Sequence, residues 1–280
     1  NGRFMGNGNW SIDTQSRNIS LVSISNDPTL CVIDLQGSSS NPRFGLQFSG
    51  QGPTTLLRGI AIINGYSADF GGAIRLDVAS PTIENCIFQN NYAYQYGGAV
   101  SGAEVCSPVI RNCIFRDNTA DYYGQGGALY FLENSTPLIE GCTFEGNNAA
   151  NGGAIFLSLD STATVSGCTF YGNNGSAIAV GAGSFLAMDT SILVGNTNYA
   201  VQAYGTGGTA QLSCCDLFGN TVANWSGIIA GQGSINNNLE ENPFFIDAEF
   251  GYFSLMLFSP CAAQNNANCG QIGAWGVISP

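Results

Sequence analysis

Residues 71–91 read GGAIRLDVASPTIENCIFQNN, and residues 97–118 read GGAVSGAEVCSPVIRNCIFRDN. Both stretches begin with a Gly-Gly-Ala-apolar tetrad and end with a Cys-x-Phe step, followed three residues after the phenylalanine by asparagine. The same pattern returns at residues 126–147 and 152–173. Repeats of this length indicate a solenoid, in which each repeat forms one coil that packs only on its neighbours.

The second half of the pattern continues beyond the four complete repeats. Its first residue is small, and the steps between successive copies are 27, 29, 26, 23 and 24 residues. The copies are Cys86, Cys113, Cys142, Cys168, Ser191 and Cys215. Earlier, less regular coils are expected around residues 19–24, 31–34 and 59–65, so the solenoid extends well beyond the clearest repeats.

The repeats contain short apolar runs separated by Gly and Asn, and none carries the i, i+3, i+4, i+7 stripe of an amphipathic helix. We therefore predict an all-β, right-handed parallel β-helix of about eight to ten coils, with about three strands in each coil. A bend is expected near Glu84 and Asn85. The solenoid is assigned to residues 1–235, and an irregular segment at 236–280 is expected to cover the last coil.

An asparagine recurs once in every coil of the pattern. The positions are Asn91, Asn118, Asn147, Asn173, Asn196 and Asn220. Amides stacked in this way can hydrogen-bond from coil to coil, which predicts a structural ladder rather than a catalytic group. The tetrad glycines permit positive φ or close backbone approach at a corner.

The chain has 7 Arg, no Lys and no His, and its formal net charge is −12. Such a charge opposes binding to nucleic acid, and no apolar run reaches the ~18 residues of a membrane span. Ten cysteines favour an oxidising, extracellular or cell-surface location. Cys261 and Cys269 flank a polar loop and are predicted to form a disulfide. The Cys86, Cys113, Cys142 and Cys168 column can form bridges between coils or serve as buried apolar thiols.

The combination of a Gly-Gly-Ala-apolar tetrad with Phe-x-x-Asn resembles the repeats of polymorphic outer-membrane proteins. More broadly, residues 55–220 resemble bacterial extracellular right-handed β-helix proteins of the pectin-lyase-like superfamily. The ending is also similar, although Asn242 and Gln271 stand where acidic residues are common in such proteins. The resemblance implies a secreted, surface-associated protein that adheres or assembles, with some enzymatic relatives.

The residues offer no convincing active site. Enzymes on this scaffold need a base, often with acidic residues that hold calcium, or clustered carboxylates. Here the only acid–base column is Arg58, Glu84, Arg111 and Glu140, whose alternating signs favour a ladder of surface ion pairs. Asp117 and Asp121 alone provide too few ligands for calcium. No catalytic residue, metal or cofactor is therefore assigned.

Aromatic and acidic residues gather in three consecutive corner loops, between the ladder asparagine and the next tetrad. These residues are Tyr66, Asp69, Phe70, Tyr92, Tyr94, Tyr96, Asp121, Tyr122 and Tyr123. Stacked by the solenoid, they can form a binding site for sugar rings or a protein partner, or the rings can simply pack together to close the corner.

Two functions from different classes follow from these observations. The first is a non-enzymatic extracellular structural or adhesive solenoid, which can self-assemble end to end through open strand edges. The alternative is a polysaccharide-binding or polysaccharide-degrading β-helix protein. The expected partners are the chain itself and surface glycans.

Overall fold

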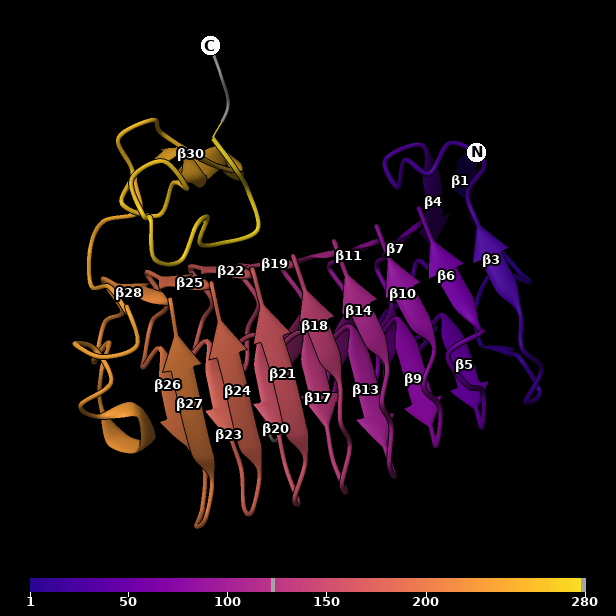
Figure 1. Cartoon of the computed structure of the whole chain (residues 1–280). Helices are drawn as coiled ribbons and strands as arrows, with labels where there is room; N and C mark the ends of the chain where they lie inside the picture. The colour runs from indigo at the N-terminus through magenta and orange to yellow at the C-terminus, as the bar shows by residue number, and fades with distance from the viewer. Residues whose placement is uncertain (122–123, 278–280) are drawn as a thin grey trace.

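The structure is a computed structural model that describes residues 1–121 and 124–277. Over these residues the chain winds into about eight coils that stack along one axis (Figure 1). Three long sheets run the length of the solenoid, and neighbouring strands within each are parallel and come from successive coils. The predicted all-β parallel solenoid with three strands per coil is confirmed. In the described part, helix is limited to two 3₁₀ turns.

Sheet 1 contains the Cys-x-Phe step and has nine strands. They are β1 (Gly2–Phe4), β4 (Cys31–Asp34), β7 (Ala61–Ile63), β11 (Ile87–Gln89), β15 (Ile114–Arg116), β19 (Thr143–Glu145), β22 (Thr169–Tyr171), β25 (Ile192–Val194) and β28 (Asp216–Phe218). Sheet 2 precedes this step in each coil and has eight strands. They are β3 (Ser20–Val22), β6 (Leu56–Arg58), β10 (Thr82–Glu84), β14 (Val109–Arg111), β18 (Leu138–Glu140), β21 (Thr162–Ser166), β24 (Phe185–Asp189) and β27 (Thr209–Ser213).

Sheet 3 contains the end of each tetrad and also has eight strands. They are β2 (Ile12–Asp13), β5 (Leu46–Ser49), β9 (Ile74–Asp77), β13 (Val100–Ala103), β17 (Leu129–Phe131), β20 (Ile155–Leu157), β23 (Ile178–Val180) and β26 (Val201–Ala203). Smaller elements complete the fold. They are β8 (Tyr66–Ser67), β12 (Tyr92–Ala93) and β16 (Thr119–Ala120), the 3₁₀ turns η1 (Gly227–Ile229) and η2 (Ala248–Phe250), and the hairpin β29 (Phe245–Asp247) with β30 (Tyr252–Leu255).

From β7 to β28, the middle residue of each sheet 1 strand points into the core. Phe88, Phe115, Phe144 and Phe170 are fully buried, and their rings stack with centroids 4.6–5.0 Å apart. Each buried ring contributes about 1.5–3 kcal/mol of transfer free energy. The repeat is thus held by identical residues meeting across the coils.

The corners before and after sheet 1 require left-handed backbone. The residue before the cysteine position has positive φ, as at Asn85 (51°) and Asn112 (53°), and so does the residue before the ladder asparagine, as at Asn90 (55°). The predicted bend at Glu84 and Asn85 is confirmed. Asparagine and glycine tolerate this conformation at low cost, which explains their recurrence there.

The asparagine ladder is confirmed. Asn118 Oδ1 accepts hydrogen bonds from the backbone N–H and the Nδ2 of Asn91, at 3.1 and 3.0 Å. Its own Nδ2 donates to the Phe88 carbonyl and to Asn147 Oδ1, both at 2.9 Å. The amide therefore satisfies both donors and its acceptor inside a fully buried corner.

The cysteine column consists of free, buried thiols, so it forms no bridges between coils. The Cys113 backbone N–H donates to Cys142 Sγ at 3.4 Å, and the Cys168 N–H donates in the same way to Ser191 Oγ at 3.0 Å. Serine can replace cysteine in the column because its hydroxyl accepts the same bond.

The predicted Cys261–Cys269 disulfide is wrong, because Cys269 pairs with Cys214 instead, with a Cα–Cα distance of 5.6 Å. Cys215 occupies the inward column, whereas Cys214, one residue earlier, lies at the corner with φ 52°. Cys214 lies between β27 and β28 and is only half-buried, so its side chain can reach the terminal segment. Cys261 is a free, fully buried thiol.

The end of the solenoid is closed by residues around η1, where Trp225, Ile228 and Ile229 pack on the core. The terminal segment does more than cover the last coil. Residues 236–277, here called the cap, turn back over the outer face of sheet 1 beside β19, β22, β25 and β28 (Figure 1). Trp275 Nε1 reaches Thr143 Oγ1 at 2.7 Å, three coils before the end.

Candidate functional site

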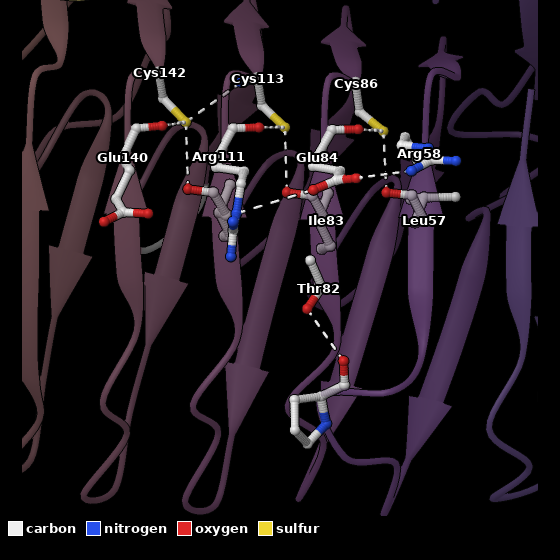
Figure 2. A network of polar contacts seen from close by, with 12 residues as sticks. Leu57, Arg58, Thr82, Ile83, Glu84, Cys86, Arg111, Cys113, Glu140 and Cys142 are labelled. Atoms are coloured by element: carbon white, nitrogen blue, oxygen red, sulfur yellow. Dashed lines mark hydrogen bonds and ion pairs between the residues drawn. The ribbon is translucent and has the colours of Figure 1, made fainter. Parts of the chain in front are cut away.

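The charged column on sheet 2 was the only acid–base arrangement expected from the sequence, and the strand register brings it together. Arg58 Nη1 lies 3.4 Å from Glu84 Oε1, and Arg111 Nε lies 4.0 Å from Glu84 Oε2 (Figure 2). Glu140 continues the column but forms no ion pair within the described chain. Each arginine keeps about 40% of its side chain exposed, so these pairs contribute less than about 1 kcal/mol.

The geometry of this column is that of a ladder of surface ion pairs. Figure 2 shows Glu84 between the two arginines, so it is neutralised from both sides rather than held ready to transfer a proton. Farther along sheet 2, a shallow hollow between β21 and β27 has Asp189 as its single carboxylate. Hydrolysis of glycosidic bonds ordinarily uses two carboxyl groups about 5–9 Å apart. Within the described residues, no group of three His, Cys, Asp or Glu side chains is placed to hold a metal ion.

The aromatic corner between sheets 1 and 3 is assembled largely as its sequence indicates. β8 and β12 pair in register, so Tyr66 lies on Tyr92 with ring centroids 4.5 Å apart and planes 11° apart. The Tyr92 hydroxyl donates to Asp121 Oδ2 at 2.8 Å. Burial, followed by the hydrogen bond to Asp121, raises the pKa of Tyr92, so the ring stays neutral at physiological pH. Both rings remain half-buried.

The remaining aromatic residues form a second stack, which separates from the first. Phe70 lies 6.3 Å from Tyr96, which lies 4.6 Å from Tyr130. Tyr130 is followed by Phe156 at 5.7 Å, and both rings are almost completely buried. This stack covers the outer face of sheet 3. Its rings pack on one another, as expected if the aromatic residues have a structural role.

The other predicted site residues lie around the two stacks. Asp69 Oδ1 accepts a hydrogen bond from Gln95 Nε2 at 3.3 Å, and Tyr94 is 40% exposed. Tyr122 and Tyr123 lie outside the described residues. The predicted patch is therefore divided: Tyr66, Tyr92 and Asp121 form one surface, and Phe70 and Tyr96 belong mainly to the packing of sheet 3.

The first stack leads into a groove that the sequence analysis missed. Thr119, Asn148 and Asn174 pair in register beyond Tyr92, and Thr197 follows in the next coil. Asn174 Nδ2 donates to Asn148 Oδ1 at 2.7 Å, and Thr197 Oγ1 donates to Asn174 Oδ1 at 2.8 Å.

An open groove of about 420 Å³ is lined by Asp121, Asn148, Asn174 and Thr197. Apart from Asp121, each of these residues directly follows a ladder asparagine. An alignment of the residues that follow the ladder asparagines would therefore have predicted this polar groove. The groove runs along the axis, and no arginine lines it.

The parallel coils, buried ladders and closed end define this protein as a parallel β-solenoid. Its sequence matches the family described as the right-handed β-helix region over residues 60–217, more than half of the chain. The chain belongs to this family, which also gives the hand of the coil. No curated protein matches the sequence. The described residues contain no helix long and apolar enough to cross a membrane.

Proposed function

We propose that this chain is a non-enzymatic, extracellular adhesive β-solenoid that binds an extended neutral glycan along the groove between Tyr66 and Thr197. The observation that carries this proposal is the continuous column in which the stacked Tyr66 and Tyr92 rings lead to Asp121, Asn148 and Asn174. Tyrosine supplies a flat apolar surface with a polar edge, and the amides supply donors and acceptors. Sugar rings present the same combination of apolar faces and hydroxyl edges.

The geometry and charge favour a long, uncharged ligand. Parallel strands repeat at about 4.8 Å, so the groove offers similar side chains at regular intervals along one line. Asp121 and the net charge of −12 disfavour polyanionic chains. The fold alone does not choose between binding and cleavage, and the proposal of binding rests on the single carboxylate in the groove.

An extracellular location is part of the proposal. It is supported by the Cys214–Cys269 disulfide, since such bonds persist in oxidising compartments. The resemblance of the repeats to those of polymorphic outer-membrane proteins, within the pectin-lyase-like superfamily, supports a bacterial cell-surface adhesin. Polysaccharide cleavage is the alternative function, and it predicts new products after incubation with a polysaccharide.

Affinity electrophoresis through gels that contain neutral or acidic polysaccharides tests the proposal. Tyr92→Ala removes the stacked pair and the contact with Asp121, and we expect about tenfold weaker binding. Tyr252→Ala is the matched control, because Tyr252 is 63% exposed on the cap, and it should bind normally. Each variant is checked by thermal unfolding.

The proposal would be contradicted by equal binding of wild type and Tyr92→Ala, or by retardation in acidic gels alone. Unsaturated products or new reducing ends after incubation would instead establish a polysaccharide-degrading enzyme.

Self-association is a second candidate function, and it involves the N-terminal end of the solenoid. Within the described chain, β1, β2 and β3 each pair with a single neighbour, so the other edge of each strand is unpaired there. Apolar side chains are exposed in the same coil, and Ile24 is 95% exposed. Open edges with apolar neighbours can pair with another chain.

A further inference from the structure

The cap covers an apolar strip on the outer face of sheet 1. Tyr171 packs against Phe245 and Phe253, with ring centroids 6.3 and 5.2 Å away. Ile192 and Val194 belong to the same buried cluster as Leu255, Cys261 and Ile272 of the cap. This contact forms a buried cluster of its own, separate from the main core of the solenoid.

A fully buried carboxylate lies within this contact. Asp216 begins β28 and pairs with Ile192, which places its side chain on the outer face of sheet 1 beneath the cap. Its Oδ1 accepts the Glu241 backbone N–H at 3.0 Å, and its Oδ2 accepts the Cys261 thiol at 3.1 Å. Both partners come from the cap.

The charged and titratable groups around Asp216 do not neutralise its negative charge. Glu240 and Glu241 approach from the cap with negative charge, the Cys261 thiol is neutral, and the Cys215 thiol lies beside it on the solenoid. No arginine in the described chain forms an ion pair with Asp216. A buried carboxylate without a cation is unfavourable in its ionised form.

We propose that the cap is a pH-responsive cover of the apolar strip, that protonation of Asp216 tightens its seating, and that the Cys214–Cys269 disulfide tethers it when it lifts. The tether joins the last coil to the cap across 55 residues. A lifted cap therefore stays close to sheet 1 while Tyr171, Ile192 and Val194 become exposed.

The direction of the effect follows from the carboxyl group. Burial, together with Glu241 and Glu240, raises the pKa of Asp216 from 3.8 to about 6, although the Glu241 N–H and the Cys261 thiol act in the opposite sense. A raised carboxyl pKa stabilises the seated form below that pKa, and this stabilisation is lost as pH rises through about 6. Between about pH 8 and about pH 5, the seating equilibrium should strengthen about tenfold.

Hydrogen exchange measured by mass spectrometry tests this directly. The protection of the β30 amides is compared with that of β19 in the same sample, so that the intrinsic pH dependence of exchange cancels. We expect the relative protection of β30 to rise about tenfold from about pH 8 to about pH 5. Asp216→Asn, which keeps the shape but not the charge, should abolish this rise.

Two further variants separate the parts of the proposal. Glu241→Gln should keep most of the pH response, because the Glu241 contact uses its backbone N–H. Cys214→Ser with Cys269→Ser should lower β30 protection at every pH and leave the pH response in place. An unchanged response in Asp216→Asn would overturn the proposal, as would exchange of β30 and β19 as one unit at both pH values.

Discussion

At the scale of single residues, the buried asparagines account for the corners of the fold. Three of these amides join three coils, because each accepts from the asparagine of the coil before, donates to the asparagine of the coil after, and donates to a carbonyl of the coil before. They are Asn118, Asn147 and Asn173. Buried backbone groups must be paired, and these corners have no regular strand partner for all of them. The ladder supplies the missing bonds.

Removing one amide from the ladder should therefore be costly. Asn147→Ala leaves the Asn118 N–H without its partner and also removes the hydrogen bonds from Asn118 Nδ2 and to the Phe115 carbonyl. We expect a loss of about 2–4 kcal/mol in the free energy of unfolding, measured by urea denaturation. Asn148→Ala, at the neighbouring half-buried position, should cost less than about 1 kcal/mol. Equal losses in the two variants would show that the ladder is not the source of stability.

At the scale of the coil, the two glycines of each tetrad have different roles. The first has positive φ, as at Gly126 (67°), and turns the chain into sheet 3. The second lies against the next coil, where a Cβ on Gly127 would collide with the Gly153 carbonyl oxygen. The first position is both conformational and steric, because a Cβ on Gly126 would also collide with the Leu129 carbonyl oxygen, whereas the second is steric alone. Only glycine therefore satisfies both positions.

The steric role gives a matched pair of variants. Gly127→Ala forces adjacent coils apart and should lower stability by about 3 kcal/mol. Gly172→Ala introduces a Cβ with no atom within 4 Å, so it carries only the cost of its left-handed backbone (φ 59°), about 1 kcal/mol. Thermal unfolding followed by circular dichroism gives both values. The steric explanation is refuted if Gly127→Ala is the milder change.

At the scale of the whole molecule, the two ends of the solenoid differ. The C-terminal end is covered by Trp225, Ile228 and Ile229, whereas β1, β2 and β3 leave open edges at the other. Head-to-tail growth into filaments needs two open, complementary ends. One open end instead favours a closed pair in which two N-terminal coils meet.

Self-association of the 280-residue chain is therefore expected to stop at a dimer. Sedimentation velocity over a concentration series should show monomer and dimer, and Ile24→Lys should shift the equilibrium to monomer by adding charge at the open end. Filaments in negative-stain electron microscopy would contradict this arrangement. The matched control, Leu257→Lys on the exposed surface of the cap, should leave the equilibrium unchanged.

The spacing of residues along the chain is enough to specify the coil and its core. Stacked phenylalanines, asparagines and cysteines recur at one position per coil, so local spacing was enough to predict the parallel solenoid, the inward face of sheet 1 and the bend at Asn85. The stacking of Tyr66 on Tyr92 also followed from the repeat, because each coil places equivalent residues directly above one another.

The contacts that involve residues outside the repeat are apparent only in the folded structure. It divided the aromatic residues into two stacks, since Tyr96 meets Tyr130 in the next coil, on the outside of sheet 3, and it extended the first stack into a polar groove. It also paired Cys269 with Cys214 and buried Asp216 beneath the cap. These contacts join segments without a common period, and only the folded path of the chain brings them together.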